Sequence, residues 1–293
     1  MNYRHAFHAG NFADVMKHAC LTLALTHLAK KPKPLFLLDT HAGTGVTPLK
    51  DPRIEKTGEL AKGVGKLLAR GVADVPDSLT PYLDLVQRCT EADDEPFYPG
   101  SPWIAHALSQ QAGRGEDRFV FCERHPEDAE ALTTLFGRER QVTVQTDDGY
   151  QALSALLPPP ERRGLVLIDP PYEERDEADQ LTRALDGALR RWRSGSYLVW
   201  YPIKDPSVSE ALLDAVAALD PPESLVLEMQ TRALDGVSMA GCGLVAINPP
   251  WTLADQGPPL LEWLAAALAR RPARLPARSA CSARFRRVAA WPS

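Results

Sequence analysis

Seven short apolar runs, separated by segments of helical character, constrain the fold of this chain more than any other feature. Several runs are apolar throughout instead of alternating with polar residues, which predicts strands buried on both faces, as in a parallel sheet covered by helices. Regular alternation of such strands with helices predicts an open, doubly wound α/β sheet. The expected strands are residues 35–38, 119–122, 142–145, 165–168, 197–200, 225–229 and 244–247. The expected helices are residues 128–136, 149–157, 176–193, 206–219 and 259–270.

Length and composition place the chain among ordinary soluble globular proteins. Its 293 residues can form one large domain or two modest ones, and 44% hydrophobic with 24% charged residues is a typical globular composition. The formal net charge of −5 argues against a surface that coats nucleic acid widely, although it allows a local basic patch.

Cysteine usage and hydropathy predict a cytoplasmic protein. The five cysteines form no C-x-x-C pair and lie too far apart for a zinc cluster, and their odd number fits a reducing compartment. The N-terminus is too polar for a secretory signal, and no apolar run approaches the roughly 18 residues that a membrane span needs. We therefore expect neither a membrane segment nor a metal site.

The alternation of strands and helices is interrupted once, between the first expected strand and Phe119. Apolar residues recur at helical spacing over residues 57–70 and 81–89, which predicts two amphipathic helices. We therefore assign residues 49–98 to a small helical insertion.

The other residues divide into a main domain, residues 1–48 and 99–270, and a tail, residues 271–293. From Arg270 onward the chain holds seven arginines and no acidic residue, and it is rich in Ala and Pro. We expect a solvated, partly disordered basic tail there, with an RNA-binding arm as the alternative.

A glycine-containing turn follows the first expected strand, in the stretch Leu-Leu-Asp-Thr-His-Ala-Gly-Thr-Gly of residues 37–45. Gly43 and Gly45 have no Cβ, so a ligand can lie directly against the backbone. In a parallel sheet this edge binds nucleotide-like cofactors, although a single G-x-G also occurs in ordinary tight turns.

Removing the insertion restores the spacing of a nucleotide-binding fold. Such folds place an acidic residue about 20 residues after the glycine turn, at the end of the second strand, where it binds ribose hydroxyls. Glu123 ends the second expected strand, 22 residues after Ser101, which is expected as the N-cap of a helix that begins with Pro102. The amide end of that helix would face the carboxylate of the cofactor, because helix N-termini favour anions.

Another acidic residue, Asp148, follows the third expected strand and precedes Gly149. Asp148 can accept a hydrogen bond from an adenine amino group or cap the following helix, and the two roles are compatible. The chain contains neither G-x-G-x-x-G nor G-x-x-x-x-G-K-[ST], which disfavours NAD and P-loop nucleotides. An adenosine cofactor with a carboxylate tail remains, and S-adenosylmethionine fits this description.

The stretch Asp169-Pro170-Pro171-Tyr172 falls at the end of the fourth expected strand, beside the same cleft. An exocyclic amine of a nucleobase is a poor nucleophile, because its lone pair is delocalised into the ring. The Asp169 carboxylate and the Pro170 carbonyl can each accept one N–H and orient the nitrogen for in-line attack on a methyl sulfonium. The ring of Tyr172 offers a face on which an extruded base stacks. The structural alternative is a stiff strand exit.

These motifs resemble one protein family. Residues 169–172 are similar to the [DNS]-P-P-[YFW] motif of amino-group methyltransferases that act on bases. From residue 2 to about 268, the chain resembles the bacterial large-subunit ribosomal RNA adenine-N6 methyltransferase J family, and it departs from that family after about Arg270. The stretches that carry this resemblance are residues 3–11, 13–15, 17–18, 38–43, 98–102 and 167–173.

The resemblance implies a Rossmann-like methyltransferase domain with a small helical insertion and an antiparallel last strand. It also implies a monomer that uses S-adenosylmethionine to methylate N6 of an adenine in 23S ribosomal RNA, naked or in an early assembly intermediate. Asp169 would act on the adenine amino group, and Tyr3 would touch the RNA. The residues implied to contact the cofactor are His18, His41, Ser101, Glu123, Asp148, Gly149 and Asp169, and the turn adds Gly43.

A near repeat of the catalytic stretch, Asn248-Pro249-Pro250-Trp251, follows the last expected strand. In the implied topology that strand is antiparallel, so the repeat would leave the sheet at the edge opposite the cofactor. We expect it to be a stiff strand exit, with Trp251 packed on a neighbouring helix.

The N-terminal segment is rich in hydrogen-bonding side chains. A metal site from His5, His8 and His18 is disfavoured, because no acidic residue or cysteine at ligand spacing completes it. We interpret the segment as folding over the active site instead of forming a solvated arm, followed by a helix over residues 11–29 with His18 on its inward face. The residues expected near RNA phosphate or base are Tyr3, Arg4, Lys17 and Tyr172.

Three other functions share part of this pattern. A DNA adenine-N6 or cytosine-N4 methyltransferase uses the same catalytic logic, but an insertion of roughly 50 residues is small for reading a DNA sequence. A non-catalytic RNA-binding protein on this fold would tolerate loss of Asp169 and Tyr172, which are both present. A protein glutamine methyltransferase solves the same chemical problem, and the histidine-rich start counts against it.

Overall fold

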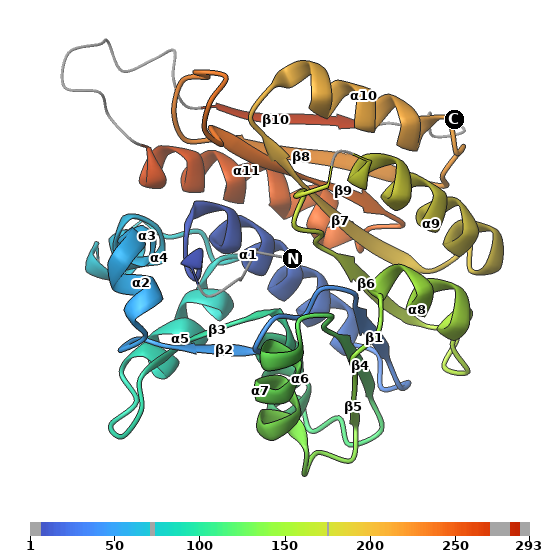
Figure 1. Ribbon diagram of the computed structural model, residues 1–293, viewed down its shortest axis with the longest axis horizontal. Coiled ribbons are helices and arrows are strands. Elements are labelled where there is room, and N and C mark those ends of the chain that lie inside the picture. Colours follow the sequence, from blue (N-terminus) through green and yellow to red (C-terminus); the bar gives the residue numbers. More distant parts are fainter. Residues whose placement is uncertain (1–6, 71–73, 175, 270–281, 288–293) are drawn as a thin grey trace.

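The computed structural model describes residues 7–70, 74–174, 176–269 and 282–287, and an eight-stranded sheet lies at its centre (Figure 1). The strands are β1 (Phe36–Asp39), β4 (Arg118–Cys122), β5 (Val142–Gln145), β6 (Gly164–Ile168), β7 (Ser196–Ile203), β8 (Ser224–Gln230), β9 (Gly241–Ile247) and β10 (Ser282–Arg287). They lie in the order β10-β8-β9-β7-β6-β1-β4-β5. Neighbours from β5 to β7 pair in parallel, whereas β9 is antiparallel to both β7 and β8, and β10 is antiparallel to β8.

Burial along the strands follows this order. Every residue of β1, β6 and β9 is buried, as their apolar sequences predict, whereas the edge strand β5 is partly exposed. Each expected apolar run forms a strand, and the expected doubly wound sheet with a late antiparallel strand is confirmed.

The tail differs from the expectation, because residues 282–287 form β10 against the edge of β8. Ala283 and Phe285 are partly buried and pack on the core, whereas Arg284 and Arg286 are exposed. This alternation is that of a half-buried strand. The rest of the tail lies outside the described residues.

Helices cover both faces of the sheet (Figure 1). They are α1 (Phe12–Ala29), α6 (Ser101–Gln111), α7 (Pro126–Phe136), α8 (Gly149–Leu156), α9 (Glu177–Arg191), α10 (Pro206–Ala217) and α11 (Trp251–Leu268). Apolar residues of α1, α6, α7 and α11 form one core cluster with the sheet, and those of α8, α9 and α10 form a second cluster on its other face. No helix among the described residues is long and apolar enough to cross a membrane.

The last helix begins earlier than expected. We expected a helix from Pro259, but α11 starts at Trp251 and holds Pro258 and Pro259 in its interior. Leu253, Leu260 and other apolar side chains of α11 are fully buried. Their burial offsets the hydrogen bonds that the two prolines cannot donate.

The insertion is helical, as expected, and two short strands join it to the main domain. Its helices are α2 (Pro52–Thr57), α3 (Glu59–Lys62), α4 (Val64–Ala69) and α5 (Thr80–Thr90), and the strands are β2 (Val46–Pro48) and β3 (Phe97–Pro99). The single helix expected over residues 57–70 is instead divided at Gly63, where a Cβ would lie 2.0 Å from the carbonyl oxygen of Gly10. This close approach of the N-terminal segment requires a glycine and a break in the helix. Buried Ile54 and Leu67 share the core of α1.

Candidate active site

The carboxyl ends of β1, β4, β5 and β6 meet at one edge of the sheet, because these strands are parallel neighbours. The glycine turn follows β1, and Glu123, Asp148 and Asp169 follow the other three strands in turn. The structure therefore brings together four expected site positions that are distant in sequence. Open α/β sheets bind their ligands at this edge.

The turn after β1 exposes its backbone toward the edge of the sheet. Gly43 and Gly45 have φ values of 61° and 78°, in the left-handed region that favours glycine. A Cβ at Gly45 would lie 2.7 Å from Cδ2 of Leu135 on α7, so a side chain there would collide with the core. The amide of Ala42 donates to the carbonyl of Cys122 at 2.8 Å, which ties the turn to β4.

Two backbone amides fix the carboxylate of Glu123. The amide of Gly43 donates to Oε2 at 2.8 Å, and the amide of His125 donates to Oε1 at 2.7 Å. Each carboxylate oxygen keeps a further lone pair, so the same group can accept hydrogen bonds from ribose hydroxyls. The expected ribose contact stays a prediction, and the rigid placement of Glu123 favours it.

Asp148 and Gly149 form the start of α8. Oδ1 of Asp148 accepts from the amide of Tyr150 at 2.9 Å, so the helix-capping role is confirmed. A Cβ at Gly149 would lie 2.0 Å from the carbonyl oxygen of Thr40, so only glycine lets α8 approach β1 this closely. The contact between Asp148 and an adenine stays a prediction.

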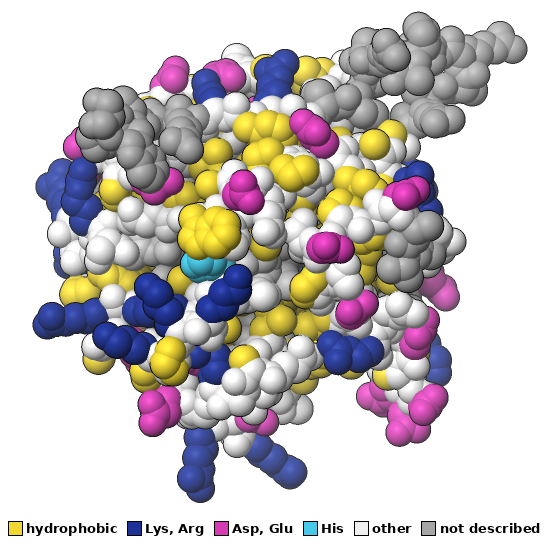
Figure 2. All heavy atoms as spheres, turned by 180° about the vertical axis from the view of Figure 1, so that it is seen from behind, with side chains coloured by type: hydrophobic (Ala, Val, Ile, Leu, Met, Phe, Trp, Pro, Cys, Tyr) yellow, Lys and Arg dark blue, Asp and Glu magenta, His cyan; other side chains and the backbone are white. Residues whose placement is uncertain are grey.

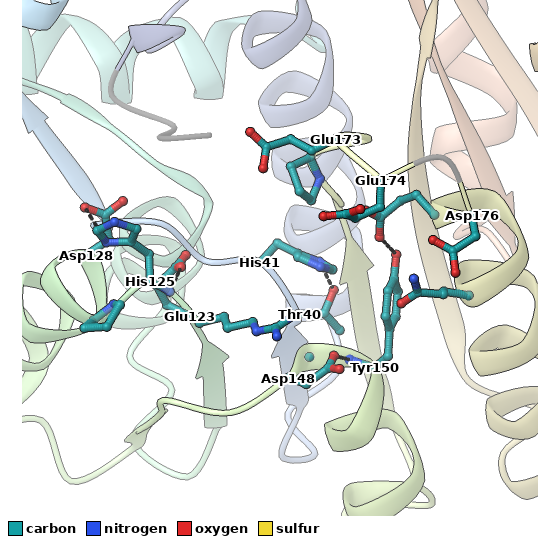
Figure 3. Close-up of a pocket in the computed structure, with 16 residues that line it drawn as sticks. Thr40, His41, Glu123, His125, Asp128, Asp148, Tyr150, Glu173, Glu174 and Asp176 are labelled. Carbon is teal, nitrogen blue, oxygen red and sulfur yellow. Dashed lines mark hydrogen bonds and ion pairs between the residues drawn. The ribbon is translucent and has the colours of Figure 1, made fainter. Parts of the chain in front are cut away.

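A cavity of about 580 Å³ lies over these residues (Figure 3). Its volume is within the usual range for small-molecule sites. The acidic residues that line it are Glu123, Asp128, Asp148, Glu173, Glu174, Asp176 and Glu177. Such a lining attracts a cationic ligand and repels phosphate groups.

Tyr150 and Glu177 are cavity residues that sequence reasoning missed. The Tyr150 hydroxyl donates to Oε1 of Glu177 at 2.7 Å, and its ring lies edge-on to His41 with centroids 5.3 Å apart. Burial raises the pKa of Glu177, and the hydrogen bond from Tyr150 opposes that rise. Both residues lie on helices, and a polar side chain on a helix does not by itself indicate a functional site in the sequence.

Asp39, the last residue of β1, is also a site residue that was not expected. It is completely buried; Oδ2 accepts from the Ser101 hydroxyl at 2.6 Å, and Oδ1 accepts from the His41 amide at 3.2 Å. Burial raises the pKa of Asp39 to about 6, although both hydrogen bonds and the charge of Lys17 oppose the rise. Its signal was an acidic residue at the end of a fully apolar strand.

The expected capping role of Ser101 is wrong. Gly100 is the N-cap of α6, and Ser101 is the first helical residue, with Pro102 second. The reason is that the Ser101 hydroxyl donates to Asp39 instead of accepting from its own helix. Ser101 therefore connects the start of α6 to the end of β1.

A smaller cavity, of about 30 Å³, shares His41 with the larger one and reaches the start of α6. The expected cofactor residues that line it are His18, His41, Gly43 and Ser101. Nδ1 of His18 lies 2.8 Å from the hydroxyl of Tyr98, which lies 3.0 Å from the hydroxyl of Tyr82. This buried hydrogen-bonded chain fixes the imidazole of His18 on the inward face of α1, as expected.

Lys17 forms a buried ion pair with Oδ2 of Asp169 and also donates to Oδ1 of Asp14 at 2.9 Å. Lys17 and Asp169 are only 5% and 6% exposed. Helix α1 turns the Lys17 side chain toward the end of β6 and away from solvent, which disfavours a contact with RNA phosphate. The expected position of Lys17 near RNA phosphate or base stays a prediction. Among the described residues, only Lys17 bonds to the Asp169 carboxylate, which leaves Oδ1 as an acceptor.

A hydrogen bond to β7 holds the ring of Tyr172 in place. Tyr172 has a φ of 52°, which residues other than glycine rarely adopt. Its hydroxyl donates to the carbonyl of Trp200 at 2.9 Å, and burial, with the nearby charges of Asp169 and Glu177, raises its pKa well above the usual value. Stacking of a base on Tyr172 and hydrogen bonding to the Pro170 carbonyl stay predictions.

The described part of the N-terminal segment rests on the insertion. The carbonyl of Phe7 accepts from the Thr57 hydroxyl at 3.0 Å, and Nδ1 of His8 lies 2.9 Å from Oε2 of Glu59. The helix expected to follow is present, with Asn11 as the N-cap of α1. The expected RNA-binding residues Tyr3 and Arg4, and His5 of the disfavoured metal site, lie outside the described residues.

A sheet of this order, with the antiparallel strand β9 inserted between β7 and β8 and an Asp-Pro-Pro-Tyr motif beside a glycine turn, defines a Rossmann-like methyltransferase. Residues 32–275 match the family model described as "Ribosomal RNA large subunit methyltransferase D, RlmJ". The chain belongs to this family of large-subunit ribosomal RNA methyltransferases.

Known relatives match nearly the whole chain. Proteins named "Ribosomal RNA large subunit methyltransferase J" from Haemophilus influenzae and Escherichia coli are 39% and 35% identical, each over 90% of this chain and 92% of the relative. A crystal structure of a Legionella pneumophila protein, 34% identical, covers 96% of this chain and 98% of its own, with a TM-score of 0.83.

Proposed function

We propose that this methyltransferase transfers the methyl group of S-adenosylmethionine to the N6 amine of an adenine in 23S ribosomal RNA, after the base has been extruded. The observation that carries the proposal is the placement of Asp169-Pro170-Pro171-Tyr172 at the end of β6, where Pro171 lines the large cavity. The relatives are named as methyltransferases of large-subunit ribosomal RNA, which supports RNA over DNA or protein.

The site fits S-adenosylmethionine, which supplies an electrophilic methyl group when bound. Glu123 has fixed acceptor oxygens that can bind ribose hydroxyls, and the Asp148 carboxylate can accept from the adenine amino group. The acidic lining complements a sulfonium charge. The smaller cavity reaches the amide end of α6 at Ser101, which suits a carboxylate.

The catalytic motif orients the amine of the target base. Oδ1 of Asp169 can accept one N–H, and the carbonyl of Pro170 can accept the other, so the nitrogen lone pair is directed toward the methyl group. The ring of Pro171 restricts the backbone that follows this carbonyl. The Asp169 carboxylate can also take the proton that the amine releases. Tyr172 supplies the aromatic surface for the extruded base.

The substrate requirement follows from base extrusion. An adenine packed inside a finished ribosomal subunit cannot leave its stack at low cost, so we infer that the substrate is naked 23S RNA or an early assembly intermediate. We further infer that the enzyme acts in the cytoplasm as a monomer.

Methyl transfer from labelled S-adenosylmethionine to unmodified 23S RNA, to DNA and to protein tests the proposal. We expect labelling of the RNA alone, and its loss in Asp169→Ala and Asp169→Asn, with melting temperatures showing that each variant is folded. Glu174→Gln, an exposed acidic residue at the same cavity, is the matched control and should keep most activity. Labelling confined to DNA, or undiminished in folded Asp169 variants, would contradict the proposal.

A further inference from the structure

The second Pro-Pro stretch leaves the sheet at the edge opposite the catalytic motif. The side-chain amide of Asn248 donates to the carbonyls of Arg193 and Gly195, each at 2.8 Å, in the loop that precedes β7. Because β7 is parallel to β6, this loop and Asp169 lie at opposite edges. The expectation that the stretch leaves the sheet at the edge opposite Asp169 is confirmed.

Trp251 contacts a neighbouring helix, as expected, but its side chain is 63% exposed and is not packed into the core. Its ring meets His27, near the end of α1, edge to face, with centroids 5.6 Å apart and an interplanar angle of 88°. Most of the indole remains in contact with solvent. An exposed indole presents a flat face on which a nucleobase can stack.

Positive charge gathers around this tryptophan. The loop of residues 30–33, Lys-Lys-Pro-Lys, has exposed lysines. Arg114 donates to the carbonyls of Lys31 and Lys33, and Arg163 also donates to the carbonyl of Lys33, so the loop is held in place. Arg163 adds positive charge, whereas the charge of Arg114 is balanced by buried Asp117. In the rear view of Figure 2, lysine and arginine side chains gather around a histidine that lies beneath an exposed hydrophobic side chain.

A cavity of about 170 Å³ lies next to Trp251, between the end of α1 and the start of α11. Among the described residues, Nδ1 of His27 and Oγ1 of Thr252 are buried there without a hydrogen-bond partner. Buried polar atoms in folded proteins nearly always have a partner, so these two atoms favour a polar ligand. Lys30 lines the same cavity, as does the acidic residue Asp77.

The chemistry of His27 suits a neutral hydrogen-bonding ligand. Burial and the charges of Lys30, Lys31 and Arg163 lower its pKa, so the imidazole is neutral at pH 7 and offers one donor and one acceptor. A nucleobase edge carries both kinds of group, and its face stacks on an aromatic ring.

We propose that Trp251, His27, Thr252 and the lysines of residues 30–33, together the Trp251 patch, form a second RNA-binding site for an unpaired nucleotide. The base stacks on Trp251 with its edge toward His27 and Thr252, and Lys30 and Lys31 bind the adjacent phosphates. This inference rests on the proposed function and extends it to how the RNA is held. A lysine-rich loop beside one exposed aromatic ring fits RNA better than it fits an apolar protein surface.

The charge of the catalytic edge favours a second site of this kind. The mostly acidic lining of the large cavity repels phosphate groups, so a basic surface elsewhere on the protein would add attraction for the RNA backbone. Lys17 and His27 are ten residues apart in α1, so the patch lies about 15 Å from the catalytic pair along the helix axis. One structured RNA can span that separation.

The test combines RNA binding with steady-state methylation, using unmodified 23S RNA as the probe. In Trp251→Ala we expect the Kd and the KM for RNA to rise about tenfold. We expect kcat and S-adenosylmethionine binding to stay unchanged, and Trp251→Phe to stay within about twofold of wild type because it keeps a stacking ring. Replacing Lys30 and Lys31 together with Ala should reduce the slope of log Kd against log salt by about 1 to 2, whereas replacing both with Arg should preserve it.

An unchanged RNA Kd, KM and salt slope in Trp251→Ala and in the double lysine variant would overturn the proposal. A change from oligomer to monomer in Trp251→Ala, with RNA binding unaltered, would also overturn it, because the patch would then join two copies of the chain. If wild-type protein binds but does not methylate 23S RNA, the proposed function fails, and the comparison of RNA affinities still decides the role of the patch.

Discussion

Lys17 on α1 and Asp169 after β6 form a buried ion pair that links the N-terminal helix to the catalytic motif. A second carboxylate, that of Asp14, also accepts from Lys17. The lysine therefore balances two acidic residues where few waters can solvate them. Removing one partner of a buried pair is strongly destabilising, because the other charge stays buried.

Lys17→Met should lower the free energy of unfolding by about 3–5 kcal/mol, because it leaves both acidic residues without this cation. Asp169→Asn should cost less, since Lys17 keeps Asp14, and the double variant should be more stable than the sum of the single losses predicts. Urea denaturation measures all three. Arg190→Met is the control, because its partner Asp186 lies on the surface and the loss should stay below about 1 kcal/mol. Additive losses at Lys17 and Asp169 would show that the pair is not coupled.

The stability of the fold should depend on pH through Asp39. Its pKa in the folded protein is about 6, above the ordinary value of 3.8, so the folded state binds this proton more tightly than the unfolded chain does. The stabilisation is present below about pH 4 and is lost as pH rises through 6. Relative to Asp39→Asn, the wild type should therefore lose up to about 3 kcal/mol between pH 4 and pH 7. Parallel denaturation curves of the two proteins over this range, with a constant difference, would contradict the assignment.

Glu123→Gln should weaken S-adenosylmethionine binding by about 10- to 100-fold. The carboxylate accepts from Gly43 and His125 through separate oxygens, and a glutamine has one acceptor oxygen, so one amide loses its partner and the turn shifts. Isothermal titration calorimetry measures the affinity, and Glu174→Gln at the exposed rim is the matched control, expected within about threefold of wild type. Equal losses in the two variants would mean that general charge, and not the fixed geometry of Glu123, controls binding.

The site residues that follow the ends of strands could be predicted from the sequence. Runs such as residues 165–168 are apolar throughout, so the strands could be located, and parallel strands place Glu123, Asp148 and Asp169 at one edge. The contact of Lys17 with Asp169 could not be predicted, because the two residues are 152 positions apart in sequence and the contact depends on how α1 packs against the end of β6.

The errors have physical causes of the same kind. Ser101 has the right residue type for an N-cap, but its hydroxyl donates a hydrogen bond to the buried carboxylate of Asp39 at the end of β1. The strand at residues 282–287 alternates as a half-buried strand does, yet its arginines gave the segment the composition of a solvated tail. Local sequence patterns identify helices and strands, whereas the packing of these helices and strands decides which side chains form hydrogen bonds or ion pairs between them.

Gly149→Ala should destabilise the protein by about 1–3 kcal/mol and weaken cofactor binding, because the new Cβ would lie 2.0 Å from the Thr40 carbonyl oxygen and push α8 off β1. Gly187→Ala, in the interior of α9 with nothing within 4 Å of the added Cβ, should instead stabilise by about 0.5–1 kcal/mol. Thermal and urea unfolding compare the two. Similar effects of both substitutions would show that helix propensity, and not the approach of α8 to β1, governs position 149.

Deletion of residues 2–10 should abolish RNA methylation while S-adenosylmethionine binding stays measurable. Residues 7 and 8 rest on Thr57 and Glu59 of the insertion, and the large cavity is lined by none of the described residues before Thr40. The segment is therefore placed to act on the RNA and not on the adenosine part of the cofactor. Calorimetry and labelled methyl transfer to 23S RNA separate the two functions, and Thr57→Val, which removes one anchor and keeps the segment, should retain partial activity. Undiminished methylation by the folded, truncated protein would exclude any part for this segment in RNA methylation.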